Sequence, residues 1–118
     1  MNNKKISISG FFPFLNDWGT IGSLVGTLDS VLKQNSSNYE IIIIDDGSDE
    51  KSKEVLKIIA DKFKKVRIIT HKKNRGYGDA IKSGISASKL DWIFYTDGDA
   101  QYDPRDLKLL LKERAKSR

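Results

Sequence analysis

Residues 40–49 have the sequence Glu-Ile-Ile-Ile-Ile-Asp-Asp-Gly-Ser-Asp, an apolar run that ends in a polar turn. Its four consecutive isoleucines, Ile41–Ile44, form a short β-branched run without a polar position. A run of this kind is typical of a strand buried on both faces of a parallel sheet. The Asp-Asp-Gly that follows is a turn signal. The stretch therefore predicts a central strand whose carboxyl end carries acidic side chains.

Strands and helices are expected to alternate along the rest of the chain. Short apolar runs predict further strands over residues 4–12, 66–70 and 92–96. Apolar residues at helical spacing predict helices over residues 20–34, 49–63 and 78–88, and a last helix that starts at Asp103-Pro104 with Leu107, Leu110 and Leu111 on its apolar face. Four such βα units imply right-handed crossovers in a mostly parallel sheet. The prediction is an α/β fold of three layers, α/β/α, in one domain over residues 1–118.

The composition is that of a single folded domain. Charged residues make up 31% and hydrophobic residues 38% of the 118 residues, which excludes a disordered chain. The absence of cysteine excludes disulfides and thiolate zinc sites. The sequence contains no apolar run near the roughly 20 residues that are needed to cross a bilayer.

Basic residues outnumber acidic residues by 21 to 16, which gives a net charge of +5, and they crowd residues 62–75 and 108–118. These two runs are expected to form solvated basic faces, and attraction to phosphates or to an anionic membrane surface is the alternative. The runs lack a pattern of interleaved aromatic residues, and no nucleic-acid-binding motif is present. Nucleic acid is therefore not an expected partner.

Polar or glycine-containing segments follow the predicted strands, at residues 13–17, 45–49, 71–78 and 97–101. The carboxyl ends of parallel strands lie at one edge of a sheet, where ligands bind in open α/β folds. The segments expected at the opposite edge contain neither glycine nor an acidic pair. This asymmetry predicts a ligand site at the carboxyl edge.

Oxygen-bearing side chains alternate along the last of these segments, at Asp97, Asp99 and Gln101. Three such ligands suit a hard divalent cation such as Mg²⁺ or Mn²⁺. An ordinary strand-ending turn is the alternative for an isolated Asp-Gly-Asp. A cation at this place would neutralise a diphosphate.

The other segments suggest recognition of a nucleotide. Asp46 is expected to accept hydrogen bonds from a base N–H or from ribose hydroxyls, as acidic residues do in nucleotide sites. The sequence leaves open whether Asp45 or Asp46 faces the ligand. Arg75 and Gly76 precede a predicted helix whose amides suit phosphate oxygens. His71, the only histidine, is expected to be a surface residue at a strand end rather than a catalyst.

Taken together, the four segments resemble motifs of the family 2 glycosyltransferases, in the GT-A fold group that includes dolichyl-phosphate mannose synthase and bactoprenol glucosyltransferases. Residues 13–17 are similar to the family's Pro-Ala-Tyr-Asn-Glu, residues 43–49 to its Val-Asp-Asp-Gly-Ser-x-Asp, and residues 74–78 to its Asn-x-Gly-x-Gly. Residues 97–104 resemble its Asp-Ala-Asp-x-Gln-x-x-Pro signature. The resemblance extends over about residues 6–111.

The resemblance implies a Rossmann-like GT-A fold, present here as the N-terminal, nucleotide-sugar-binding half and truncated after the fourth βα unit. An enzyme of this kind binds a UDP- or GDP-linked sugar with Mg²⁺ or Mn²⁺ and transfers the sugar with inversion. Its acceptor is expected to be a polyprenyl phosphate at the cytoplasmic face of a membrane. The general base is expected beyond residue 118, so no catalytic residue is assigned. A non-catalytic nucleotide-sugar-binding module is the alternative.

The resemblance also assigns site residues. The nucleotide-sugar pocket is expected to contain Pro13, Leu15, Asp17, Ile44, Asp46, Asp97, Gly98 and Asp99, and the metal site Asp97, Asp99 and Gln101. Arg75 and Gly76 remain candidates for the phosphate side on the chemistry of the residues alone. Leu15 stands where the family has an aromatic residue, and Asp17 stands where it has glutamate. The open edge expected beyond the fourth strand suggests an apolar surface that a second copy of the chain covers.

Overall fold

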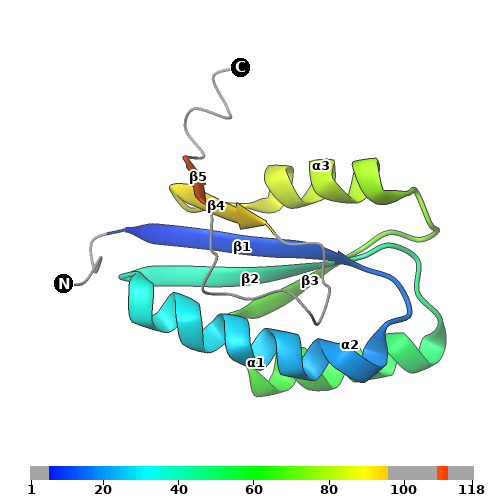
Figure 1. Ribbon diagram of the computed structural model, residues 1–118. Helices are drawn as coiled ribbons and strands as arrows, with labels where there is room; N and C mark the ends of the chain where they lie inside the picture. The colour runs from blue at the N-terminus through cyan, green and yellow to red at the C-terminus, as the bar shows by residue number, and fades with distance from the viewer. Residues whose placement is uncertain (1–5, 96–108, 112–118) are drawn as a thin grey trace.

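The fold is that of a computed structural model, which describes residues 6–95 and the backbone of residues 109–111. The described elements are β1 (Ser7–Phe14), α1 (Trp18–Asn35), β2 (Asn38–Asp45), α2 (Glu50–Lys62), β3 (Val66–Thr70), α3 (Tyr77–Ala87), β4 (Trp92–Tyr95) and β5 (Leu109–Leu111). They form one sheet with the strand order β3-β2-β1-β4-β5 (Figure 1). The first four strands in this order are parallel, as predicted, and β5 is antiparallel to β4.

Helices cover both faces of the sheet. Figure 1 shows α1 and α2 together on one face and α3 on the other. Ile41 and Ile43 of β2 belong to the core under α1 and α2, whereas Ile42 and Ile44 belong to the core that includes Ala80 of α3. All four isoleucines are fully buried. The predicted central strand with two buried faces is therefore confirmed.

The first two helices form where the apolar spacing predicts them. The buried side chains of α1 recur at helical spacing, at Ile21, Leu24, Val25, Leu28 and Leu32. Helix α2 begins at Glu50, and the carboxylate of Asp49 caps it by accepting a hydrogen bond from the Ser52 N–H at 2.9 Å. No described helix is long and apolar enough to span a membrane.

The prediction of a last helix is wrong for the residues of that segment that the structure describes. Leu109–Leu111 form β5, and Leu109 pairs with Phe94 of β4 in antiparallel register. Residues 103–108, which include the expected start of that helix, lie outside the described residues. An uncovered β4 would expose a row of unpaired backbone N–H and C=O groups, and pairing with β5 satisfies them. The predicted open edge beside β4 is thus covered, which removes the reason given for expecting a second copy.

A polar network around Glu40 closes the amino edge of the sheet. This carboxylate accepts hydrogen bonds from Ser9 Oγ at 2.6 Å, Arg67 Nε at 3.1 Å and the Lys89 N–H at 2.9 Å. Burial would raise the pKa of Glu40, but these bonds more than offset burial and hold the pKa below its ordinary value of 4.5. Arg67, which belongs to the basic run at 62–75, therefore serves the fold rather than a ligand.

Helix α3 approaches the sheet closely because Gly84 has no side chain. A Cβ atom built on Gly84 would overlap the ring of Phe11, which is fully buried in β1. We expect Gly84→Ala to lower the free energy of unfolding by about 1–3 kcal/mol, the usual effect of overpacking. Gly22→Ala is the matched control, because nothing lies within 4 Å of a Cβ there. In a helix interior, alanine should raise stability by about 0.5–1 kcal/mol. Urea denaturation measures both, and equal effects would contradict the close approach.

Candidate functional site

The loops that follow β1, β2 and β3 are joined at the carboxyl edge of the sheet. The Asn16 N–H donates to Ser48 Oγ at 3.1 Å, and the Asp49 N–H donates back to Asn16 Oδ1 at 2.8 Å. Asn16 has a φ of +57°, in the left-handed region that asparagine tolerates better than most residues. The predicted gathering of polar loops at this edge is confirmed for these three loops.

The carboxylate of Asp46 joins the loop after β2 to the loop after β3. Its Oδ1 accepts from the Arg75 N–H at 2.9 Å and lies 2.7 Å from Nδ1 of His71. Its Oδ2 accepts from the Gly76 N–H at 3.0 Å. The Asp46 side chain is 7% exposed. Burial alone would raise the pKa of Asp46, but these three hydrogen bonds more than offset it and hold the pKa below its ordinary value of 3.8.

Asp45 and Asp46 have different roles, which the sequence left open. Asp45 Oδ1 accepts from the Ser48 N–H at 3.0 Å, and its Oδ2 pairs with Lys53 Nζ of α2 at 3.1 Å. Asp45 therefore stabilises the turn and the start of α2. Asp46 is the aspartate that faces the loop after β3 and the adjacent cavity.

Gly47 allows the two loops to touch. Its φ is +86°, and a Cβ built on it would lie 2.5 Å from the backbone nitrogen of Asn74 and 2.8 Å from the carbonyl carbon of Lys73. Backbone atoms cannot move aside as the end of a flexible side chain can. Glycine is therefore required here by both conformation and space.

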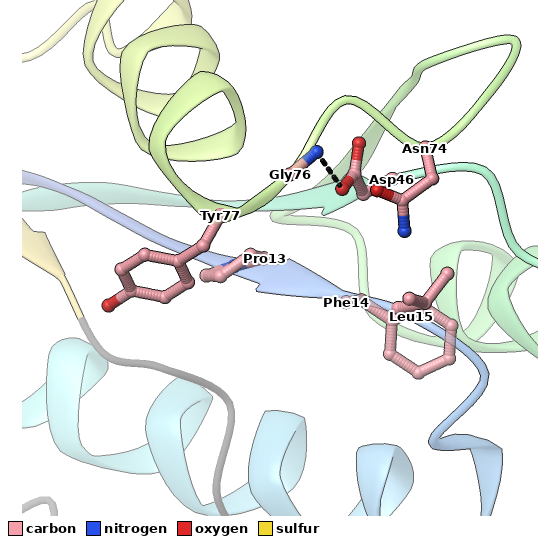
Figure 2. A pocket seen from close by; sticks show the side chains of 7 residues that line it. All are labelled: Pro13, Phe14, Leu15, Asp46, Asn74, Gly76 and Tyr77. Carbon is pink, nitrogen blue, oxygen red and sulfur yellow. Dashed lines mark hydrogen bonds between the residues drawn. The ribbon is translucent and has the colours of Figure 1, made fainter.

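A cavity of about 250 Å³ opens beside Asp46. It is lined by Pro13, Phe14, Leu15, Asp46, Asn74, Gly76 and Tyr77 (Figure 2). Figure 2 shows the ring of Tyr77 and the side chain of Leu15 on opposite sides of Pro13. Among the described residues the wall is mainly apolar, and it includes the carboxylate of Asp46, which is a common design for a small-molecule site.

The structure brings together some of the predicted site residues. Pro13, Leu15, Asp46 and Gly76 all line the cavity. Asp17 is exposed just before α1, and Ile44 is fully buried in the core under α3. The exposed Arg75 borders a neighbouring hollow with Lys72 and Lys73, while its N–H binds Asp46. The predicted Asp97, Gly98, Asp99 and Gln101 lie outside the described residues.

Two kinds of residue were missed by the sequence reasoning. Phe14 and Tyr77 line the cavity, although neither was assigned to the pocket. Tyr77 is 55% exposed, and its ring lies 6.4 Å from that of Tyr95 at the end of β4. The expectation of a surface histidine is wrong, because His71 is 3% exposed. The pairing of Thr70 with Asp45 places His71 beside Asp46, and the sequence carries no local signal of that pairing.

The metal prediction is not tested by the described residues. Among residues 6–95 no group of three His, Asp or Glu side chains is arranged to hold a metal ion. The proposed ligands Asp97, Asp99 and Gln101 follow the end of β4 in sequence and are not among these residues. Their carboxylate and amide oxygens nonetheless form the type of donor set that Mg²⁺ and Mn²⁺ prefer.

Residues 11–117 match glycosyl transferase family 2. The undecaprenyl-phosphate 4-deoxy-4-formamido-L-arabinose transferase of Aeromonas hydrophila is 32% identical over 117 residues, which cover 95% of this chain and 35% of the relative. The dolichyl-phosphate beta-glucosyltransferase of Saccharomyces cerevisiae is 31% identical over 116 residues, which cover 93% of this chain and 35% of the relative. The chain thus spans about a third of the length of these curated relatives.

A solved structure has the same fold. It is a mannosyltransferase from Pyrobaculum calidifontis in complex with GDP-Man and Mn²⁺, with a TM-score of 0.70 and 13% sequence identity. The match covers 80% of this chain and 28% of that chain. At this identity the likeness concerns the fold, and it confirms the predicted Rossmann-like GT-A class.

The buried charge of Asp46 makes stability depend on pH. Because the folded pKa is depressed, the stabilisation is fully present above about pH 4 and is lost as pH falls through the folded pKa. We expect Asp46→Asn to lower the free energy of unfolding by about 2 kcal/mol at pH 7. The reason is that a neutral amide cannot replace a carboxylate that accepts three hydrogen bonds. The cost should shrink towards pH 3. The exposed Asp91→Asn should change stability by less than about 0.5 kcal/mol at either pH. A cost that does not vary with pH would contradict this account.

Gly47 should be less tolerant of a side chain than another glycine with positive φ. Gly76 has a φ of +97°, but nothing lies within 4 Å of a Cβ built on it. Gly76→Ala should therefore lower the free energy of unfolding only through backbone strain, by about 1–3 kcal/mol. Gly47→Ala should lose about 2 kcal/mol more, because the clash with Asn74 is added to strain. Chemical denaturation of both variants checks the order, and equal losses would show that the loops do not touch.

Proposed function

The chain belongs to glycosyl transferase family 2, and we propose from this premise that it binds a nucleoside-diphosphate sugar for transfer to an acceptor. The observation that carries the proposal is the Asp46 carboxylate, ionised and aimed by three donors in the wall of a cavity. The cavity lies at the carboxyl edge of the parallel strands, where ligands bind in open α/β sheets.

The nucleoside is proposed to occupy this cavity. An ionised carboxylate only accepts hydrogen bonds, so Asp46 suits a base N–H or a ribose hydroxyl. Pro13 at the end of β1 and Leu15 directly after it would contact the nucleoside. Tyr77 offers an aromatic surface in the same cavity, which supports stacking even though Leu15 replaces the family's aromatic residue.

The phosphates are proposed to lie at the start of α3. The N–H groups of Arg75 and Gly76 already bind Asp46, so they are not free for phosphate. The Arg75 guanidinium and the N–H groups of the first turn of α3 remain as anion donors on this side. Asp79 in the same turn is a counter-charge that limits this attraction.

The cofactor is proposed to be Mg²⁺ or Mn²⁺, held by Asp97, Asp99 and Gln101. These residues lie outside the described part of the chain, so the support is their oxygen donor set and the similarity to the family motif. A bound cation at this place would stabilise the nucleoside diphosphate as a leaving group.

Transfer is proposed to occur with inversion to a lipid phosphate at the cytoplasmic face of a membrane. The support is that two relatives carry undecaprenyl-phosphate and dolichyl-phosphate in their names. The second candidate is nucleotide-sugar binding without transfer. It is favoured for this stretch alone because the described residues form a binding cavity and include no assigned general base. Release of nucleoside diphosphate from a labelled donor sugar distinguishes the two candidates.

Calorimetric titration with UDP and GDP, with and without MnCl₂, tests the proposed binding. We expect millimolar or tighter affinity for one of the two, strengthened by the metal. Asp99→Asn should weaken the metal-dependent affinity by about tenfold or more, roughly the value of a charge-assisted contact. Asp91→Asn is the matched control at the opposite edge of the sheet, where Asp91 accepts from Ser7, and it should bind as the unmodified chain does. Absence of any nucleotide binding would end the proposal.

A further inference from the structure

His71 is buried between the cavity wall and helix α3. Its Nδ1 lies 2.7 Å from Asp46 Oδ1, and its Nε2 lies 2.8 Å from Ser83 Oγ. The ring itself does not line the cavity. His71 therefore connects a helix to the carboxylate that faces the ligand without reaching the ligand itself.

The chemistry of the three groups determines the direction of the hydrogen bonds. Asp46 is ionised at neutral pH, because its pKa is held below the ordinary value, so its oxygens only accept. Nδ1 of His71 must then carry the proton and donate to Asp46. Nε2 is an acceptor from the Ser83 hydroxyl when the ring is neutral and a donor to the Ser83 oxygen when the ring is protonated, so the bond to Ser83 forms in either state. Both ring nitrogens of His71 therefore have a hydrogen-bond partner, and the two bonds form a relay from Ser83 of α3 to the Asp46 carboxylate.

The relay leaves one acceptor position of Asp46 open within the described residues. A carboxylate has about four lone-pair positions. Oδ1 uses two of them, for His71 and the Arg75 N–H, and Oδ2 uses one, for the Gly76 N–H. The remaining position belongs to Oδ2, and Asp46 lines the cavity.

We propose that His71 is a positioning residue for nucleotide binding: it occupies Oδ1 of Asp46 and so presents Oδ2 to the nucleoside. The inference rests on the proposed function, in which Asp46 accepts a hydrogen bond from the nucleotide. Without the ring, the carboxylate keeps only the two backbone N–H donors of Arg75 and Gly76, and no side chain then fixes its orientation from the side of α3. The Arg75–Gly76 turn then loses its fixed partner, and the cavity wall that this turn forms loosens with it.

Calorimetric titration of three variants tests this role, with UDP or GDP as the probe, whichever the unmodified chain binds more tightly. His71→Ala should weaken binding about tenfold, the loss expected for a hydrogen bond to a charged group. His71→Asn places an amide N–H near the former Nδ1 and should bring affinity back to within about threefold. Ser83→Ala removes only the outer bond and should weaken binding about threefold.

Ile59→Ala is the control for lost stability, because Ile59 is buried in the core under α2, away from the cavity. It should lower the free energy of unfolding while leaving affinity within about twofold. Unchanged affinity in His71→Ala, an equal loss in Ile59→Ala, or no recovery in His71→Asn would overturn the role of His71. If His71→Ala does not fold, Ser83→Ala decides, and unchanged affinity there overturns it. Failure of the unmodified chain to bind either nucleotide would instead contradict the proposed function.

Discussion

The carboxylate of Asp46 is the group on which the carboxyl edge of the sheet depends. A charge with a side-chain exposure of 7% costs free energy unless donors surround it. Its three donors come from residues 25 to 30 positions later in the chain. The loop after β3 is therefore placed by β2 as much as by β3. Because Asn74, Gly76 and Tyr77 belong to that loop and its helix, the same bonds that satisfy the charge also form the cavity.

Much of the fold was predictable because the local pattern of apolar residues matches the faces that the structure buries. The isoleucine run is too short and too uniformly apolar for a helix. Its alternate side chains are buried against different helical layers. The apolar spacing of α1 repeats every three or four residues, so its buried face followed directly. Parallel strands then required the polar loops to share one edge, and the contacts among the loops after β1, β2 and β3 follow from that topology.

The remaining features depend on contacts between distant segments. Leu109–Leu111 suit a helix or a strand on their own, and the backbone groups along the edge of β4 select the strand. His71 looked like a surface residue because nothing in its neighbours reveals that Thr70 pairs with Asp45. The cavity role of Tyr77 depends on where α3 begins, which is determined by Gly76 and the Asp46 carboxylate rather than by helix propensity.

The two consecutive aspartates have different roles, because Asp45 stabilises the fold and Asp46 lines the cavity. Successive side chains of a strand point to opposite faces, so Asp45 meets Lys53 of α2 while Asp46 meets His71 on the side of α3. A shift of one residue would exchange these roles. The isoleucines cannot prevent it, because they are apolar in either register. Polar contacts at both ends of the strand therefore select the register. Glu40 binds Ser9 and Arg67 at one end. At the other end only a glycine at position 47 fits against Asn74, and the Ser48 N–H binds Asp45. The isoleucines specify the strand, but the polar residues before and after them, Glu40, Gly47 and Ser48, determine which aspartate faces the cavity.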